Sequence, residues 1–596
     1  MYKQQPLTFF FLFIFATCAA ISAQAEPQPE SLPQVQTQAQ SKTQDQTQAQ
    51  QASLGQPLLQ KQLEQLYFED AAHMGTDPIY AIGPLLELYK KNQYRLLWQE
   101  KQKIDELHQA VLASAEDGLT PADYHLQFID SCLKSPEERL STQELVTRDI
   151  LLSDAFLLLG EHNRHGKVNI HDAPDKKGLL GTEMPQVDVT FYLSALSENK
   201  VLPALSGLTP QTEAYTNLKR GLAHYLAIAD KGDWPPIPDG GKGLKLGMSS
   251  SRIPLIRERL FLTGELTQGE LKNNRYDKDL AAAVQIFQER NGLEPDGVAG
   301  KSTIAAMNVP IETRIQQIRA NMERIRWILH GMPPSALIVD IAGFRLNYFH
   351  NNTLAWTTRV MVGRPLNQTP VFRSAINYLV LNPTWTVPPD MLKKEVIPRI
   401  IANRSYLQNE NLKVYTFQGE EVNARGIDWA SYKDKGFPYV LQQEPGPDNS
   451  LGRIKFMFPN PYHVYLHDTP SKSLFSRNTR ALSHGCIRVQ SPLDLGRMIV
   501  DHDANSKMSV KQYDAILAAG KTTGFALKTP LPVFLVYTTA RAEEDIVFFN
   551  PDVYDRDEAV IKALNRPPRA LEQATIPAET LKTEKEQPDN HEENSL

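Results

Sequence analysis

The spacing of apolar residues changes once along this chain of 596 residues, close to the paired prolines Pro333 and Pro334. Before the prolines, apolar side chains recur every three or four residues, as in residues 151–159, which is the period of an amphipathic helix. After them, apolar and polar side chains alternate, as in residues 344–349, which is the period of a strand. The sequence therefore predicts a multidomain α+β protein whose helical part precedes a β-rich part.

The helical part divides into three predicted units: a helical scaffold domain at residues 58–243, a compact three-helix unit at 247–308 and a linker helix at 309–334. The first boundary is the breaker-rich stretch at residues 232–243. In the second unit, Leu280, Val284 and Phe287 have the spacing of one buried helix face.

The β-rich part is predicted to form a sandwich-like domain over residues 335–545. Residues 385–450 interrupt its pattern with an irregular stretch that is too long for an ordinary connection. We interpret this stretch as an inserted lid over a functional site. Residues 546–596 form a C-terminal extension that is expected to be largely disordered past residue 566, where the sequence is polar.

The first 25 residues are typical of a secretory signal peptide, with Lys3 before an apolar run and Ala23-Gln24-Ala25 at the end. The apolar run is too short to span a bilayer, and no later stretch of the mature chain is apolar enough to do so. Residues 26–57 are rich in Gln and Thr and are predicted to be a disordered tether. The sequence thus predicts an exported protein of the bacterial periplasm.

The charge and cysteine content exclude two classes of protein. Lys and Arg number 63 against 69 Asp and Glu, so the chain has no overall basic character for binding nucleic acid. The three cysteines cannot form a disulfide framework, since Cys18 lies in the leader. Of the other two, we interpret Cys132 as an inert, half-buried thiol, and Cys486 requires another explanation.

Cys486 lies in a stretch with several chemically active side chains, residues 462–492. If His463–His467 is a strand, Val464 and Leu466 face the core, and His463, Tyr465 and His467 face the other side. The same alternation places Ile487 and Val489 in the core and His484, Cys486 and Arg488 opposite. The two segments therefore expose a common group of polar side chains, provided that they are neighbours in one sheet.

These residues can supply each part of a thiol-based acyl transfer. A cysteine reacts as its thiolate and needs a base or cation, for which His467 and His484 are candidates. The base needs an acceptor for its second ring nitrogen, and Asp468 offers either its carboxylate or its backbone carbonyl. The backbone amides of Gly485 and Cys486 could converge on a developing oxyanion.

Two alternatives remain at this point. His467, His484 and Cys486 could bind zinc, although no fourth ligand stands at the usual spacing. They could also be structural residues. A cysteine left free between two histidines is an unusual choice for packing in an oxidising compartment, which favours catalysis.

Two resemblances extend this interpretation. The segment AVQIFQERNGLEPDGVAGKSTIAAMN resembles the peptidoglycan-binding type 1 domain, which implies affinity for the cell-wall glycan or its stem peptides. His467 and the Ser483-His484-Gly485-Cys486 element with Arg488 resemble the signature of L,D-transpeptidases of the YkuD type. The segments IAGFRLNYFHNNTLAWTTRVMVGRPLNQTPVF and LNPTWTVPPDM resemble the catalytic domain of the larger periplasmic members of that family.

The second resemblance implies a role for each motif residue. Cys486 would be the nucleophile and His467 the general base, oriented by the backbone carbonyl of Asp468, while His484, Gly485 and Cys486 shape the oxyanion pocket. Four residues are assigned to substrate binding: Arg488, Ser483, Tyr465 and Trp385. Arg488 suits the carboxylates of the donor peptide because of its planar fork, and the alternative is that it braces the loop.

The implied activity is the formation of 3→3 cross-links in peptidoglycan. Cys486 would form a thioester with a tetrapeptide donor stem and release D-alanine, without a metal, ATP or other cofactor. The same acyl-enzyme could instead attach an envelope protein or be hydrolysed, as in an L,D-carboxypeptidase. Other expected partners are wall-synthesis enzymes, and carbapenems are expected to acylate Cys486. The non-enzymatic alternative is a scaffold that binds the cell wall.

Overall fold

The computed structural model describes residues 55–69, 72–134, 140–169, 186–328, 331–433, 435–503 and 508–571. The predicted signal peptide, most of the tether and the tail beyond residue 571 lie outside the described residues. A helix occupies residues 55–67, so helical structure begins inside the last three residues of the predicted tether. The predicted α+β class with several domains is confirmed.

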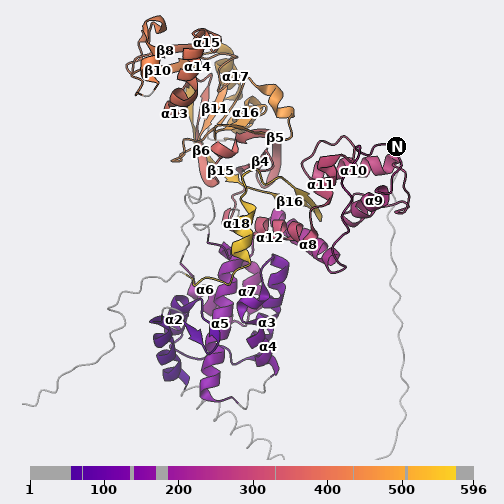
Figure 1. Cartoon of the computed structure of the whole chain (residues 1–596). Helices are drawn as coiled ribbons and strands as arrows, with labels where there is room; N and C mark the ends of the chain where they lie inside the picture. Colours follow the sequence, from indigo (N-terminus) through magenta and orange to yellow (C-terminus); the bar gives the residue numbers. More distant parts are fainter. Residues whose placement is uncertain are drawn as a thin grey trace, which may run out of the picture. The chain divides into compact units, whose positions relative to one another are not determined.

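The scaffold is a helical bundle around the buried helix α5 (Thr142–His165), as Figure 1 shows. Ser141 begins α5 with a capping box, in which its side chain accepts from the amide of Glu144 and the Glu144 side chain accepts from the amide of Ser141. Apolar residues surround the whole length of α5 except its ends, so the helix lies in the bundle core. The other elements of the bundle are α2 (Ile82–Lys91), α3 (Lys101–Ala113), α4 (Leu126–Lys134), α6 (Val189–Ser197), α7 (Val201–Gly207) and the short strands β1 (His73–Met74) and β2 (Asp77–Pro78).

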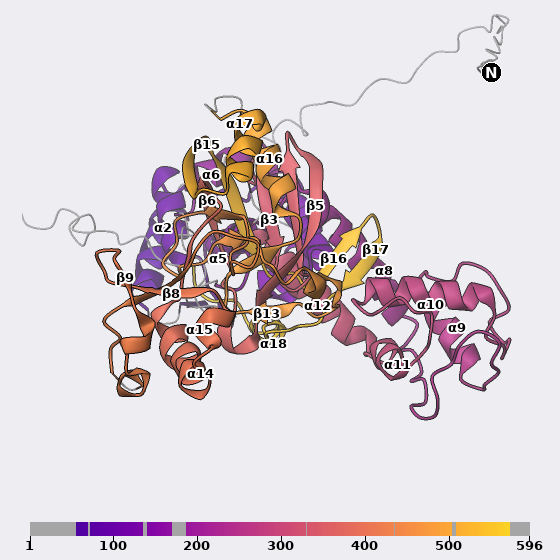
Figure 2. The same ribbon diagram turned by 90° about the horizontal axis from the view of Figure 1, so that it is seen from above.

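The predicted three-helix unit consists of α9 (Ile253–Leu262), α10 (Lys278–Arg290) and α11 (Lys301–Met307), which lie together in Figure 2. Leu280, Val284 and Phe287 are buried in its core, as their spacing predicted. Asp277 caps α10 by accepting from the amide of Leu280. The predicted linker helix is α12 (Ile311–Ile328).

The helices α12 and α8 (Glu213–Ala229) share a hydrophobic core with a β-hairpin of β16 (Ala540–Glu543) and β17 (Ile546–Phe549). The hairpin crosses the predicted boundary at residue 545, which therefore does not separate two structural units. The last helix, α18 (Asp557–Leu564), packs against α12. The first part of the C-terminal extension is thus ordered.

A buried ion pair within α12 also makes hydrogen bonds to the scaffold. Arg326 donates to Glu323 at 2.8 Å and to the Tyr215 hydroxyl at 2.7 Å, and it also donates to the backbone carbonyl of Asp117. Glu323 also accepts from the amide of Val168 at 2.6 Å. Since both charged side chains are almost fully buried, removing one of them would leave the other without its counter-ion.

We predict that Arg326→Met lowers the free energy of unfolding by about 3 kcal/mol, because Glu323 would stay buried and unpaired. Urea denaturation followed by tryptophan fluorescence measures this loss. The matched control is Arg497→Met, which removes an exposed ion pair with Asp514 and should cost less than about 1 kcal/mol. Equal losses in the two variants would contradict the role of the buried pair.

The β-rich part is built on a nine-stranded mixed sheet in the order β13-β5-β14-β12-β11-β6-β15-β3-β4. β4 also pairs with β5, so the strand pairings close on themselves. Asn351 and Asn352 form the turn between these two strands, and both have positive φ. The strands are β3 (Ala336–Asp340), β4 (Arg345–His350), β5 (Thr353–Gly363), β6 (Phe372–Leu381), β11 (Ile454–Met457), β12 (Leu466–His467), β13 (Ala481–Ser483), β14 (Ile487–Val489) and β15 (Thr523–Val536).

Two helices complete the core of this part, α16 (Pro492–His502) and α17 (Val510–Ala519). Figure 1 shows both beside the sheet. Gly496 of α16 lies against Ile454 of β11 and Tyr513 of α17, where a larger residue would not fit. The helices therefore pack closely against β11, which neighbours β12.

The predicted lid has regular structure and a hydrophobic core of its own. Its four-stranded sheet has the order β7-β10-β8-β9, and Val414 and Leu441 are fully buried between the sheet and the helices. The prediction of an irregular stretch was therefore wrong, because short strands and one-turn helices give only a weak periodic pattern. Its elements are β7 (Trp385–Thr386), α13 (Pro389–Met391), a π-helix (Leu392–Val396), α14 (Ile397–Ala402), α15 (Tyr406–Asn409), β8 (Leu412–Tyr415), β9 (Glu421–Val422) and β10 (Val440–Gln443).

Candidate active site

The two segments of the predicted site are neighbouring strands. β12 and β14 pair in parallel, with Leu466 opposite Ile487 and His467 opposite Arg488. Leu466 and Ile487 are fully buried in the core of the sheet. Because side chains alternate along a strand, His467 and Arg488 lie together on the opposite face. The two segments are therefore neighbours in one sheet, as the predicted site required.

The chain around His463 is a turn instead of the predicted strand. The side chain of Asn460 accepts from the amide of Val464 at 3.0 Å and donates to its carbonyl at 2.8 Å, which closes a tight loop. His463 lies in this loop with φ of 56° and an exposed side chain. Its backbone carbonyl, not its ring, approaches the site, at 3.7 Å from Cys486 Sγ.

The loop that carries Cys486 is also not a strand. Gly485 has φ of 116°, a conformation that favours glycine, and its carbonyl accepts from Thr369 at 2.7 Å. Ser483 donates to the carbonyl of Cys486 at 2.6 Å and accepts from the amide of Gly485 at 3.1 Å. The Ser483 hydroxyl therefore braces the loop. The oxyanion role predicted for the Gly485 amide would require the exchange of this bond for one to the substrate.

His467 is held by the backbone carbonyl of Asp468. The carbonyl oxygen lies 2.5 Å from His467 Nδ1, which leaves Nε2 available as the base when Nδ1 carries the proton. The Asp468 carboxylate has other partners, since it accepts from the amides of Thr469 at 2.7 Å and Arg453 at 2.9 Å and pairs with Lys472. Of the two acceptors that the sequence left open, the structure places the carbonyl against the ring.

The surroundings of His467 strongly favour its neutral form. Burial lowers the pKa of the imidazole to about 3, and the positive charges of Arg488, Lys455 and Lys472 contribute to this shift. The bond to the Asp468 carbonyl acts in the opposite direction. At neutral pH the ring is thus uncharged and able to accept a proton.

The thiol of Cys486 is subject to opposing effects. Burial raises its pKa, while hydrogen bonds from the backbone amide and the hydroxyl of Tyr465, and the charges of Lys455 and Arg488, lower it. Burial raises the pKa of Tyr465 itself, and so does its contact with Cys486. Its hydroxyl therefore keeps its proton and can donate to the sulfur.

His484 connects the catalytic loop to the insertion. Its Nε2 lies 2.8 Å from the carboxylate of Glu395 and 2.6 Å from the guanidinium of Arg364. The hydrogen bond with His484 lowers the pKa of Glu395. Since Glu395 lies on the π-helix of the insertion, the position of this helix is tied to the residue next to Gly485.

The remaining predicted site residues are placed as follows. Arg488 is half-buried, and among the described residues its Nε has no hydrogen-bond partner, so the side chain has donor capacity left for a carboxylate. The ring of Tyr465 meets that of His467 edge to face at 5.6 Å. Trp385 lies on β7 and packs half-buried against the core of the insertion. The substrate roles of these residues stay predictions.

The sequence analysis missed four residues around the site: Lys455, Thr369, Tyr554 and Glu395. Thr369 links Gly363 of β5 to Gly485 through its hydroxyl, and Tyr554 donates to the carbonyl of Gly363 at 2.5 Å. The contacts of Thr369 with Gly485 and of Tyr554 with Gly363 join residues more than 100 positions apart, so local patterns do not reveal them. Lys455 is different, because it alternates with the apolar residues Ile454 and Phe456. That pattern could have placed it on the face of His467.

The described residues contain no group of three or more His, Cys, Asp or Glu side chains placed to hold a metal ion. Burial raises the pKa of the other cysteine, Cys132, which lies half-buried against the scaffold core.

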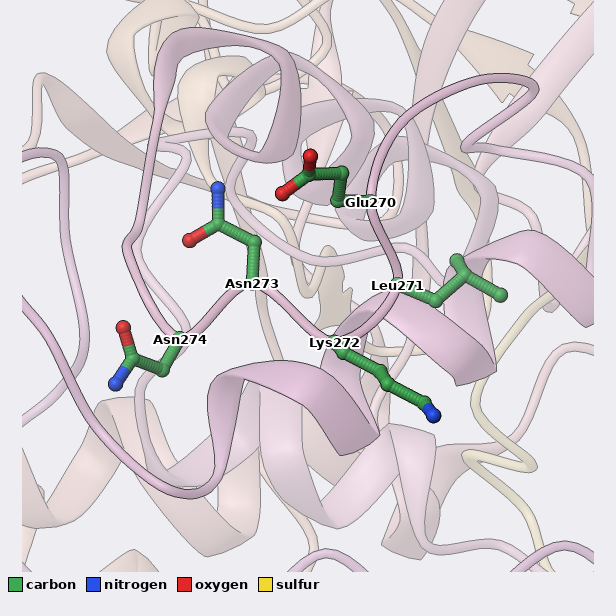
Figure 3. A pocket seen from close by; sticks show the side chains of 5 residues that line it. All are labelled: Glu270, Leu271, Lys272, Asn273 and Asn274. Atoms are coloured by element: carbon green, nitrogen blue, oxygen red, sulfur yellow. The ribbon is translucent and has the colours of Figure 1, made fainter.

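A shallow hollow lies in the three-helix unit, on the loop between α9 and α10. Five residues line it: Glu270, Leu271, Lys272, Asn273 and Asn274. In Figure 3 the side chains of Glu270 and Asn273 point to the same side of the loop, and those of Leu271 and Lys272 point away. None of the predicted catalytic residues lines this hollow.

Three segments of the chain match known protein families. Residues 334–503 match the L,D-transpeptidase catalytic domain of the YkuD family. The chain carries a YkuD L,D-transpeptidase domain. Residues 259–307 match a family described as "Putative peptidoglycan binding domain", and residues 84–222 match one described as a scaffold domain.

A protein of Haemophilus influenzae named "Putative L,D-transpeptidase" is 33% identical over 310 residues. The match covers 50% of this chain and 62% of the relative, less than two thirds of its length. L,D-transpeptidase structures from Stackebrandtia nassauensis and Mycobacterium smegmatis are 14% and 12% identical, with TM-scores of 0.20 and 0.17. The two matches cover 50% and 34% of this chain, and 96% and 58% of the matched chains, respectively. We draw no conclusion from likenesses at these scores.

No helix among the described residues is long and apolar enough to cross a membrane.

Proposed function

We propose that the protein forms 3→3 cross-links in peptidoglycan through a thioester at Cys486, with a tetrapeptide stem as donor. The observation that carries the proposal is the placement of His467 and Cys486. His467 lies on β12, and Cys486 directly precedes β14, the strand that pairs with β12. The imidazole is oriented by the Asp468 carbonyl, and the thiol is bonded by Tyr465. The YkuD family match covers this region.

The first half-reaction acylates the enzyme. The sulfur of Cys486 attacks the carbonyl carbon that precedes the terminal D-alanine, and the thiol proton passes to His467 Nε2. The bond to the D-alanine nitrogen then breaks, and this nitrogen takes the proton from His467 as the amino acid leaves. The stem is left on the enzyme as a thioester.

The second half-reaction transfers the stem. A side-chain amine of a neighbouring stem attacks the thioester carbonyl, and neutral His467 accepts the proton that the amine loses. The carbon–sulfur bond breaks, and the sulfur leaves as a thiolate that recovers a proton from His467. The spare donor capacity of Arg488 fits it to hold a carboxylate of the donor stem.

We further propose that the enzyme acts in the periplasm after removal of residues 1–25. The signal-like sequence of this segment and the peptidoglycan-binding unit support that location.

Incubation of the mature chain with tetrapeptide muropeptides, followed by mass analysis of the products, tests the proposal. A dimer that lacks one D-alanine is the expected product. Tripeptide monomers alone would indicate an L,D-carboxypeptidase, and transfer to an added envelope protein would indicate attachment. Unchanged muropeptides, with retained binding to intact sacculi, would show a wall-binding scaffold and overturn the proposal.

A further inference from the structure

Three polar residues form one row across adjacent strands of the catalytic sheet. Lys455 of β11 pairs with His467 of β12, and His467 pairs with Arg488 of β14. Residues opposite one another in a sheet share a face, so the imidazole is flanked by an ammonium on one side and a guanidinium on the other. The adjacent residues Ile454 and Ile487 are fully buried on the opposite face, which fixes this orientation.

The side chain of Lys455 extends from this row toward Tyr465 and Cys486, which lie two residues before His467 and Arg488. Its Nζ lies 4.3 Å from the centroid of the Tyr465 ring, within the range of a cation–π contact. The same tyrosine bonds the sulfur of Cys486 through its amide and its hydroxyl. Lys455 also interacts electrostatically with Cys486. The ammonium thus acts electrostatically on the thiol as well as on the base.

Two cationic side chains act on the thiol. Lys455 and Arg488 are both half-buried and both interact electrostatically with Cys486. The carboxylate of Asp468, directly after β12, is paired with Lys472 and bonded to two backbone amides. The thiol itself donates to the carbonyl of His463 at 3.7 Å. The two cations therefore favour the ionised sulfur and oppose burial, which raises the pKa of the thiol.

We propose that Lys455 is a positioning residue whose charge, together with that of Arg488, favours loss of the Cys486 proton and keeps His467 uncharged. The inference rests on the proposed function of Cys486 as nucleophile. The thiol proton passes to His467 as the sulfur attacks, and Lys455 and Arg488 keep their protons throughout. The ionising sulfur then has an ammonium and a guanidinium to balance its charge, and His467 is neutral and able to accept the proton.

The test is the pH dependence of the alkylation of Cys486 by iodoacetamide in the full mature chain. The alkylated residue is identified by peptide mass, which separates Cys486 from Cys132. We expect Lys455→Met to slow alkylation about tenfold at pH 7 and to move the midpoint up by about one pH unit. Lys455→Arg keeps the charge and should stay within about threefold of the wild type. Lys413→Met, which removes an exposed lysine of β8, is the matched control and should change nothing.

Identical pH profiles for Lys455→Met and the wild type would overturn the inference. A reciprocal measurement avoids substitution of the lysine: in Cys486→Ala the thiolate is gone, so Lys455 should lose its proton more readily. We expect acetic anhydride to acetylate Lys455 several times faster at pH 9 in Cys486→Ala than in the wild type. Equal rates would also overturn the inference.

Neither assay uses a stem peptide, so the inference and the proposed function can fail separately. The expected alkylation profiles without cross-linked product would retain the role of Lys455 and reject the transpeptidase. Cross-linked product, with the same alkylation profile in Lys455→Met as in the wild type, would support the transpeptidase and reject the role of Lys455.

Discussion

Cys486→Ser should abolish the acyl-enzyme and reduce cross-linking at least a thousandfold. The hydroxyl of serine is far harder to ionise than a thiol, and the cations and the Tyr465 bonds that act on the sulfur are too few to close that gap. Burial already raises the pKa of the native thiol, so the same surroundings would not ionise the weaker acid serine. Intact-mass analysis after incubation with a tetrapeptide stem measures the adduct directly.

Cys132→Ser is the matched control for this experiment. Cys132 lies half-buried against the scaffold core, where burial raises the pKa of its thiol, and its replacement should leave acylation unchanged. A carbapenem serves as a second acylating probe and should give one adduct, at Cys486. An acyl adduct on the Cys486→Ser chain, or a carbapenem adduct mapped to Cys132, would contradict the assignment of the nucleophile.

Much of the fold follows from local patterns in the sequence. The helical spacing of Leu280, Val284 and Phe287 predicted a buried face, which lies in the core of the three-helix unit. The pairing of β12 with β14 was different, because it joins segments separated by residues 468–486, which include β13. The sequence could state this pairing only as a condition for the site.

The predictions that were wrong concern the strand at His463 and the irregular insertion. Both depend on contacts that a local pattern does not show, either between distant residues or between a side chain and the backbone. The side chain of Asn460 ends the predicted strand at His463 by bonding the backbone of Val464, which an alternation of apolar residues cannot show. The insertion is held by a small core of its own, with Val414 and Leu441 brought together by strand pairing. The orientation of His484 toward Glu395 depends on that insertion, which starts about 100 residues earlier.

His467→Gln should reduce the rate of cross-linking about a thousandfold, which is the usual contribution of a general acid–base residue. Glutamine can still donate to the Asp468 carbonyl but cannot carry a proton between the thiol, the leaving D-alanine and the incoming amine. Steady-state kinetics with tetrapeptide donors measure this loss. A rate within tenfold of the wild type would contradict the role of His467 as base.

The same variant distinguishes two ways of stabilising the thiolate. If an imidazolium were the counter-ion, His467→Gln would slow alkylation of Cys486 by iodoacetamide as strongly as it slows cross-linking. Because the pKa of His467 is lowered to about 3, its ring is neutral above that pH, and the positive charge near the sulfur comes from Lys455 and Arg488. We therefore expect alkylation to stay within about threefold of the wild type between pH 6 and 9, and to rise with pH as the thiol ionises. A parallel loss of both rates would show that His467 is charged in the resting enzyme.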